Sequence, residues 1–228
     1  MPELLLELLS EEIPARMQKR AGEDLQRLVC DGLKKAGLTF DSAAAYATPR
    51  RLTLVVTGLP DKQPDVKDER KGPQVGAPEQ AINGFLGSLG GLTLDDCVQR
   101  DVKGKTFWFA VIDKKGQLTT KILEQIITNA LIAFNWPKSM RWRNSIYRWV
   151  RPLHSILAVF DDSLVKLGFP IGQTTDSLVY ETTHGIEHER DKNFIYFSKT
   201  TVGHRFLSPE PFVVTNFDDY KTKLMANK

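Results

Sequence analysis

The fold of this chain is decided near its beginning, by residues 3–37, which read ELLLELLSEEIPARMQKRAGEDLQRLVCDGLKKAG. Leucines dominate residues 3–9, and the capping and turn formers that follow leave this run too short for a helix, so it predicts a short strand. After Pro14, apolar residues recur at every third or fourth position until Gly37, which suits the left-handed conformation that ends helices. A helix over residues 15–37 is therefore predicted, with one apolar stripe formed by Met17, Ala21, Leu25, Leu28, Val29 and Leu33.

Further strands and helices follow without a regular strand–helix–strand rhythm. Strands are predicted at residues 44–48, 51–57, 155–160 and 193–197, and a short-loop hairpin pairs residues 97–101 with 106–112. Helices are predicted from Pro78 to Gly90 and from a cap at Thr119 or Thr120 to Phe134. This mixture predicts an α+β fold: a mixed β-sheet with packed helices, and no Rossmann or P-loop unit.

A charged, proline-containing stretch at residues 61–73 has almost nothing to bury, which is typical of an exposed connection. We therefore expect an N-terminal α+β subdomain at residues 1–60, the exposed connection at 61–73, and a second α+β subdomain at 74–228. A chain of 228 residues is long enough to bury its cores without disulfide or metal staples.

The composition excludes several classes of protein. The longest apolar runs fall well short of the roughly 20 residues of a membrane helix, so a soluble chain without a membrane partner is expected. Cys30 and Cys97 fit no C-x-x-C spacing, which favours a reducing compartment such as the cytoplasm. Glu3 and Glu7 interrupt the first apolar run, so a signal peptide is not expected. The net charge of +3 does not by itself indicate a nucleic-acid partner.

Charge is nevertheless concentrated in residues 134–154, which hold five basic residues, no acidic one, and three of the four tryptophans. Cations neutralise phosphates and aromatic rings stack on unpaired bases, so the combination suits single-stranded or looped RNA. The same composition also suits a core of aromatic rings with arginines lying across it, and composition alone weights the two interpretations equally. The block consists of Lys138, Arg141, Arg143, Arg148 and Arg151 with Trp136, Trp142, Tyr147 and Trp149.

Other motifs give little sign of catalysis. His184, Glu187 and His188 match the zinc pattern H-x-x-E-H, but Gly185 sits inside the required helix and no third ligand is indicated, so no metal is predicted. Neither a phosphate loop nor a G-x-S-x-G elbow is present, and we predict no catalytic residue. Glu11 and Glu12 stand at a helix start, where capping is favoured over acid–base chemistry.

Residues 202–206 are a compact polar and aromatic cluster. In it, His204 can donate and accept hydrogen bonds and Arg205 can hold a phosphate with two hydrogen bonds. The alternative is a simple turn in which Arg205 pairs with Glu210.

Six segments in order resemble the N-terminal part of the beta subunit of bacterial glycine–tRNA ligase. They cover nearly the whole chain, and their order is far more specific than any one of them. The segments are Glu11-Glu12-Ile13-Pro14, Thr48-Pro49-Arg50-Arg51-Leu52, Lys71-Gly72-Pro73, Pro137-Lys138-Ser139-Met140-Arg141-Trp142, Val150-Arg151-Pro152-Leu153-His154 and Gly203-His204-Arg205-Phe206-Leu207.

The resemblance implies a cytoplasmic enzyme of two alpha and two beta chains. The alpha subunit would carry the class II catalytic core with ATP, Mg and glycine, and beta would serve mainly in recognition of tRNA-Gly. The present chain would then be non-catalytic and hold no cofactor, and we expect it to be a fragment without the family's HD-like and anticodon-binding domains. Two departures stand out: Arg143 replaces the usual glycine, and residues 172–200 have the character of an insertion.

The candidate RNA-binding residues are Arg50, Arg51, Lys138, Arg141, Trp142, Arg151, His154, His204 and Arg205. The lysine and the arginines at 141 and 151 would hold phosphates, Trp142 would stack on a base or an arginine, and the histidines would donate hydrogen bonds or be satisfied in the interior. One alternative is a purely structural module, or one that docks on alpha, whose sign would be buried tryptophans and arginines paired with carboxylates. A remote alternative is a metal hydrolase using residues 184–188.

Overall fold

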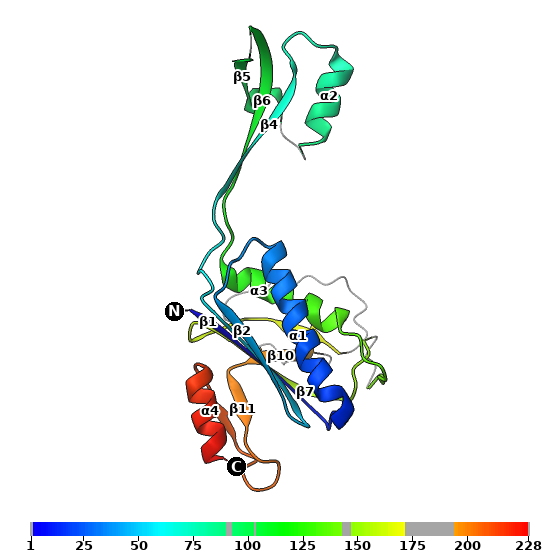
Figure 1. Cartoon of the computed structure of the whole chain (residues 1–228), viewed down its shortest axis with the longest axis vertical. Coiled ribbons are helices and arrows are strands. Elements are labelled where there is room, and N and C mark those ends of the chain that lie inside the picture. Colours follow the sequence, from blue (N-terminus) through cyan, green and yellow to red (C-terminus); the bar gives the residue numbers. More distant parts are fainter. Residues whose placement is uncertain (1, 90–92, 103, 143–146, 172–193, 228) are drawn as a thin grey trace. The chain divides into compact units, whose positions relative to one another are not determined.

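The computed structural model describes the chain except residues 1, 90–92, 103, 143–146, 172–193 and 228 (Figure 1). It divides into two compact units, the first comprising Met1–Gln63 and Gln117–Lys228 and the second Pro64–Gly116. Both units combine helices with strands, which confirms the predicted α+β class.

The first unit is built on a sheet whose described strands follow the order β2-β3-β1-β7-β10-β9, with β8 paired to β7. Strand β1 lies between β3 and β7 and is antiparallel to both, whereas β10 runs parallel to β7. The predicted strand at residues 3–9 is therefore confirmed and is central. The bounds are β1 Glu3–Ser10, β2 Ser42–Ala47, β3 Arg51–Thr57, β7 Leu153–Phe160, β8 Ser163–Leu164, β9 Gly168–Pro170 and β10 Phe194–Ser198.

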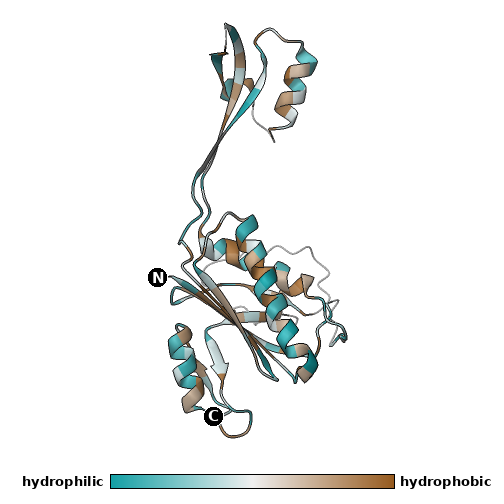
Figure 2. Cartoon of the chain, in the orientation of Figure 1, coloured by the Kyte–Doolittle hydropathy of each residue, from teal (hydrophilic) through white to brown (hydrophobic). Residues whose placement is uncertain are grey.

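Helices α1 (Ala15–Lys35) and α3 (Thr119–Ala133) cover one face of this sheet. Leu4, Leu6 and Leu8 of β1 belong to the same buried cluster as the apolar stripes of both helices. Figure 2 shows both hydrophilic and hydrophobic surfaces on α1, as expected for a helix with one buried stripe. The helix ends as predicted: Gly37 has φ +70°, and the Leu38 N–H donates to the Leu33 carbonyl at 2.9 Å.

Strands β11 (Thr200–Val202) and β12 (Pro211–Val213) and helix α4 (Phe217–Ala226) cover the other face. Leu5 of β1 packs there in a second buried cluster with Val214 and Tyr220. Strand β1 is thus buried on both faces of the sheet, which explains why leucines occupy consecutive positions in it without alternation.

The second unit is a three-stranded antiparallel sheet in the order β4-β6-β5, accompanied by helix α2. The bounds are β4 Val66–Gln74, α2 Glu79–Gly87, the 3-10 turn η1 Leu94–Asp96, β5 Cys97–Val102 and β6 Lys105–Lys114. Its buried cluster is small, consisting of Leu89, Cys97 and Ala110. A Cβ on Gly72 would come within 2.6 Å of the Phe85 ring, so glycine lets α2 approach the strand closely.

Most predicted elements are confirmed, but two expectations are corrected. Residues 61–73 are not a simple connection, because β4 begins at Val66 and pairs with β6. Thr119 does not cap α3: it is the first helical residue, and its hydroxyl donates to the Pro60 carbonyl.

The unit boundaries also differ from the predicted subdomains, because residues after Gln117 return to the first unit, where β7 pairs with β1. Local composition carries no signal of such a long-range pairing. None of the described helices combines the length and apolar character required to cross a membrane.

Candidate nucleic-acid interface

Five of the six sequence segments meet near the end of β1, and the segment at 203–207 joins the other four through Arg205. The Ser10 N–H donates to the Arg50 carbonyl at 2.9 Å, and the Glu11 N–H donates to the Pro152 carbonyl at 3.0 Å. These bonds join residues 11–14 to residues 48–52 and 150–154. The backbone of Met140 pairs with that of Trp149 through bonds of 2.7 and 3.1 Å, which brings residues 137–142 beside the segment that leads into residues 150–154.

The Glu11 carboxylate is the centre of this meeting point. His154 Nε2 lies 2.8 Å from Glu11 Oε1, Arg205 Nη1 lies 3.6 Å from Oε2, and Arg50 Nη2 lies 4.0 Å from Oε1. The hydrogen bond with His154, followed by the charges of His154, Arg50 and Arg205, lowers the pKa of Glu11 below its ordinary value. Three residues proposed for RNA binding therefore contact the same carboxylate, that of Glu11.

The capping interpretation of Glu11 and Glu12 is wrong. The N-cap of α1 is Pro14, no side chain caps the helix, and its first turn has no acidic residue. Glu12 is exposed instead, and it lines an open depression together with Glu11, Met140, Arg151 and Arg205.

Lys138, Arg141 and Arg151 differ from the other candidates. All three are exposed, and none forms a hydrogen bond or ion pair within the described part of the chain. Arg148, by contrast, donates to the Ser139 hydroxyl at 3.0 Å and to the Ser139 carbonyl. Among its residues that the structure describes, the basic block thus presents three cations that are free to meet an external anion.

The tryptophans of the same block belong to the core. Trp136, Trp142 and Trp149 are 7%, 9% and 2% exposed. The rings of Trp136 and Trp149 lie 5.1 Å apart, and both contact Phe134. A stacking role for Trp142 on an RNA base is therefore not supported, because its ring is enclosed by the protein. The block divides into an aromatic interior and a cationic exterior.

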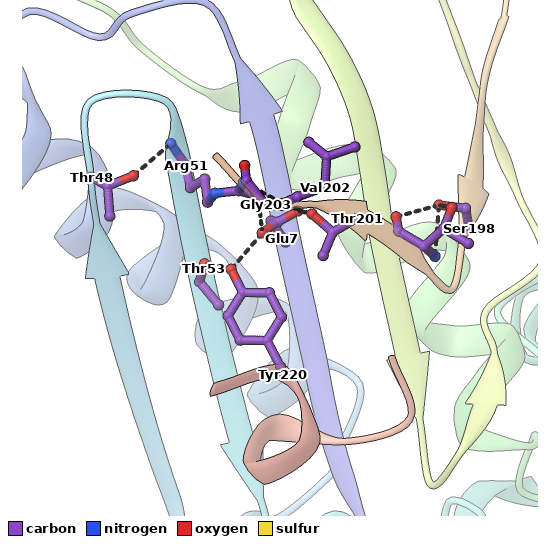
Figure 3. Close-up of polar contacts among 10 residues, drawn as sticks. Glu7, Thr48, Arg51, Thr53, Ser198, Thr201, Val202, Gly203 and Tyr220 are labelled. Carbon is purple, nitrogen blue, oxygen red and sulfur yellow. Dashed lines mark hydrogen bonds and ion pairs between the residues drawn. The ribbon is translucent and has the colours of Figure 1, made fainter. Parts of the chain in front are cut away.

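Arg51 is held inside the protein, which corrects its assignment as an RNA-binding candidate. Its Nη1 lies 2.9 Å from Glu7 Oε2, and its Nη2 donates to the Val202 carbonyl and, at 3.0 Å, to the Gly203 carbonyl (Figure 3). Glu7 is fully buried and the Arg51 side chain is 13% exposed. The ion pair links β1 to β3, and the hydrogen bonds of Arg51 to the two carbonyls fasten β11 to them.

Tyr220 and Thr201 complete the network around Glu7. Both hydroxyls donate to the Glu7 carboxylate, and the Tyr220 oxygen also lies 3.1 Å from Thr53 Oγ1 (Figure 3). Burial, with the Glu7 charge second, raises the pKa of the Tyr220 phenol far above its ordinary value. Our sequence reasoning missed this network, although a glutamate inside a leucine run was a signal of it.

His204 serves the turn that follows β11. The backbone N–H of His204 donates to the Asn227 carbonyl at 2.9 Å. The ring Nδ1 of His204 accepts hydrogen bonds from the backbone N–H groups of Phe206 and Leu207, each at 3.2 Å. The imidazole thereby stabilises the turn. Arg205 reaches Glu11 and not Glu210, the partner considered from the sequence.

Several predicted features lie outside the described residues, namely His184, Glu187, His188 and Arg143. Within the described residues, no group of three or more His, Cys, Asp or Glu side chains is arranged to hold a metal ion. The predicted insertion at residues 172–200 includes a part of the sheet, because β10 pairs with β7 and β9.

Comparison with known proteins agrees with the ordered segments. A family model described as glycyl-tRNA synthetase beta subunit matches residues 4–228. The glycine–tRNA ligase beta subunit of Rhodospirillum centenum is 50% identical over 227 residues, and that of Paracoccus denitrificans is 46% identical over 224. Each alignment covers 98% of this chain but only 32% and 30% of the relative. The chain belongs to the glycyl-tRNA synthetase beta-subunit family.

Proposed function

We propose that this chain contributes tRNA binding to a glycine–tRNA ligase, with Lys138, Arg141 and Arg151 contacting phosphates of tRNA-Gly. The observation that carries the proposal is the difference between these three cations and their neighbours. Arg50, Arg51, His154 and Arg205 have carboxylate partners within the protein, whereas the three proposed residues are exposed and have none among the described residues. Exposed cations without internal partners are the groups that neutralise phosphates at least cost.

The paired residues have a supporting role in this proposal. The Glu11 contacts hold the segments at 48–52, 150–154 and 203–207 together, and the backbone pairing of Met140 places residues 137–142 beside them. A rigid scaffold that orients cations lowers the entropy lost on binding. His154 and Arg205 therefore position the surface, and the cations at 138, 141 and 151 make the contacts.

The whole protein is proposed to act as a heteromeric ligase. As the family resemblance implies, ATP, Mg and glycine would bind to the alpha subunit in the cytoplasm, and this chain would add no group to the chemical step. The family match gives no support to the metal-hydrolase alternative at residues 184–188.

Assembly with the alpha subunit is a second candidate role, favoured by two observations. The tryptophans of the basic block are buried and Arg50, Arg51 and Arg205 are paired with carboxylates, as expected of a structural or docking module. Phe206 and Leu207 are 77% and 76% exposed on the turn that His204 stabilises. Two adjacent apolar side chains held in the solvent by a fixed turn are suited to insertion into a partner surface.

Cross-linking tests the proposed tRNA contact. Ultraviolet cross-links between the complete beta chain and tRNA-Gly, mapped by mass spectrometry, should occur in peptides that contain residues 138, 141 or 151. Cross-links confined to other regions of the beta chain would contradict the proposed tRNA contact.

A further inference from the structure

A separate pocket lies between the first half of α1 and the segment that follows α3. Its lining includes Arg16 and Arg20 from the helix and Asn135 and Lys138 from the segment. Arg16 and Arg20 are one turn apart, so both guanidinium groups face the same side of α1. Neither arginine was a candidate from the sequence, because the basic block alone directed attention to residues 134–154.

The charges around this pocket favour an anionic ligand. Arg16 and Lys138 are exposed and make no hydrogen bond or ion pair in the described parts of the chain. Asp24 also lines the pocket, but its carboxylate is already shared by Arg20 at 3.6 Å and Arg27 at 2.9 Å. The pocket therefore keeps a net positive charge.

The remaining lining is suited to a flat, partly apolar group. Met17, Ala21 and Trp136 are buried and form the apolar part of the wall. Asn135 is exposed beside them, and its amide can both donate and accept hydrogen bonds, which is the requirement for pairing with the edge of a nucleobase. A nucleotide with an unstacked base fits both parts of the lining, because its phosphate can contact the cations and its base can lie against the apolar wall.

We propose that this pocket binds one unpaired nucleotide of an RNA, with its phosphate on Arg16 and Lys138, where Arg20 adds further positive charge, and its base beside Asn135. This inference rests on the proposed tRNA-binding function and adds a site that distinguishes single-stranded from duplex RNA. A duplex cannot enter the pocket, because its bases are stacked and paired.

The test measures binding of the complete beta chain to a short single-stranded RNA and to the same RNA annealed as a blunt duplex. Arg16→Gln with Arg20→Gln should weaken single-strand binding by about tenfold and flatten its salt dependence, while duplex binding stays within about twofold. Asn135→Ala should weaken single-strand binding by about fivefold at an unchanged salt slope, since it removes hydrogen bonds and no charge. Lys19→Gln with Lys34→Gln is the matched control, because it removes two charges from exposed lysines of the same helix that lie outside the pocket.

Three results would overturn the inference. If the arginine variant loses affinity for single-stranded and duplex RNA equally, the two arginines act only as general surface charge. Competition by an oligoglutamate as strong as that by RNA of equal charge would assign the pocket to acidic peptides. Single-strand binding that is unchanged by the substitutions of Arg16, Arg20 and Asn135 would show that the pocket does not bind RNA.

The proposed function has a separate outcome in the same assay. If duplex and tRNA binding respond to Arg141→Glu and Arg151→Glu while the pocket variants have no effect, only the pocket inference is wrong. If the unaltered protein binds none of the RNAs, both proposals are wrong.

Discussion

Glu7 on β1 and Arg51 on β3 form an ion pair of 2.9 Å in which the carboxylate is fully buried. The two strands are antiparallel neighbours in the sheet, and the pair also contacts the layer that covers it. Arg51 donates to the carbonyls of Val202 and Gly203, and Tyr220 of α4 donates to Glu7. Because its members come from β1, β3, β11 and α4, this network fixes the layer formed by β11 and α4 onto the sheet.

We predict that Glu7→Gln lowers the free energy of unfolding by about 3–5 kcal/mol, because it leaves the Arg51 charge buried without compensation. Urea unfolding followed by circular dichroism measures this change. Glu12→Gln is the control, since that exposed residue should change stability by no more than about 0.5 kcal/mol. A loss below about 1 kcal/mol for Glu7→Gln would show that water or rearrangement compensates Arg51.

Gly203→Ala should destabilise the C-terminal layer. A Cβ at this position would lie 2.7 Å from Asn227 Cβ and also collide with the Asn227 carbonyl oxygen, so the end of α4 must move. Such overpacking costs about 1–3 kcal/mol. Hydrogen exchange should show faster exchange in α4 and unchanged protection in α1. Unchanged exchange in α4 would contradict the packing of Asn227 against Gly203.

The Glu11 carboxylate predicts a specific pH dependence. A carboxyl whose pKa is lowered by folding adds stability that is fully present above the ordinary value of 4.5 and is lost as the pH falls through the lowered value. Carbon-13 NMR titration should give Glu11 a pKa below 4.5 in the unaltered protein. In His154→Ala that pKa should rise toward the ordinary value. An identical titration in both proteins would mean that His154 is not its main partner.

Substitutions in the exposed turn at residues 206 and 207 should impair assembly with alpha without impairing folding. Phe206→Ser with Leu207→Ser should leave the melting temperature nearly unchanged, because both side chains are mostly in solvent. Association of the complete beta chain with alpha, measured by analytical ultracentrifugation, should weaken by at least tenfold if the turn inserts into alpha. Val213→Ser, at an exposed apolar residue on β12, is the control. Unchanged association would exclude the turn from that interface.

The elements that depend on local pattern could be predicted from the sequence. The stripe of α1 and its end at Gly37 follow from spacing and backbone preference, and the structure confirms both. The network of Glu7 could not be predicted in the same way. Its partners Arg51 and Tyr220 lie 44 and 213 positions away, and residue pattern carries no signal of such contacts.

The candidate site was predicted in composition but not in geometry. The basic and aromatic residues at 134–154 share one segment, yet Trp142 is buried while Arg141 beside it is exposed. Adjacent residues point to different environments whenever a segment lies on a surface, and only the fold shows which side is inside. The role of Glu11 was misjudged for a related reason, because its partner His154 is 143 positions away.

The measurement that tests the central claim most directly is the salt dependence of tRNA-Gly binding. The complete beta chain is compared with a variant of it that carries Lys138→Glu, Arg141→Glu and Arg151→Glu. A control variant reverses Lys105, Lys115 and Lys166, three other exposed lysines, in the same way. Circular dichroism and thermal melting establish that all three proteins are folded.

We predict that the variant at 138, 141 and 151 binds at least tenfold more weakly at low salt. The slope of log affinity against log salt concentration should become shallower by about two to three, as expected for the loss of three phosphate contacts. The control variant should retain both affinity and slope. Equal behaviour of the two folded variants would contradict a tRNA contact at Lys138, Arg141 and Arg151.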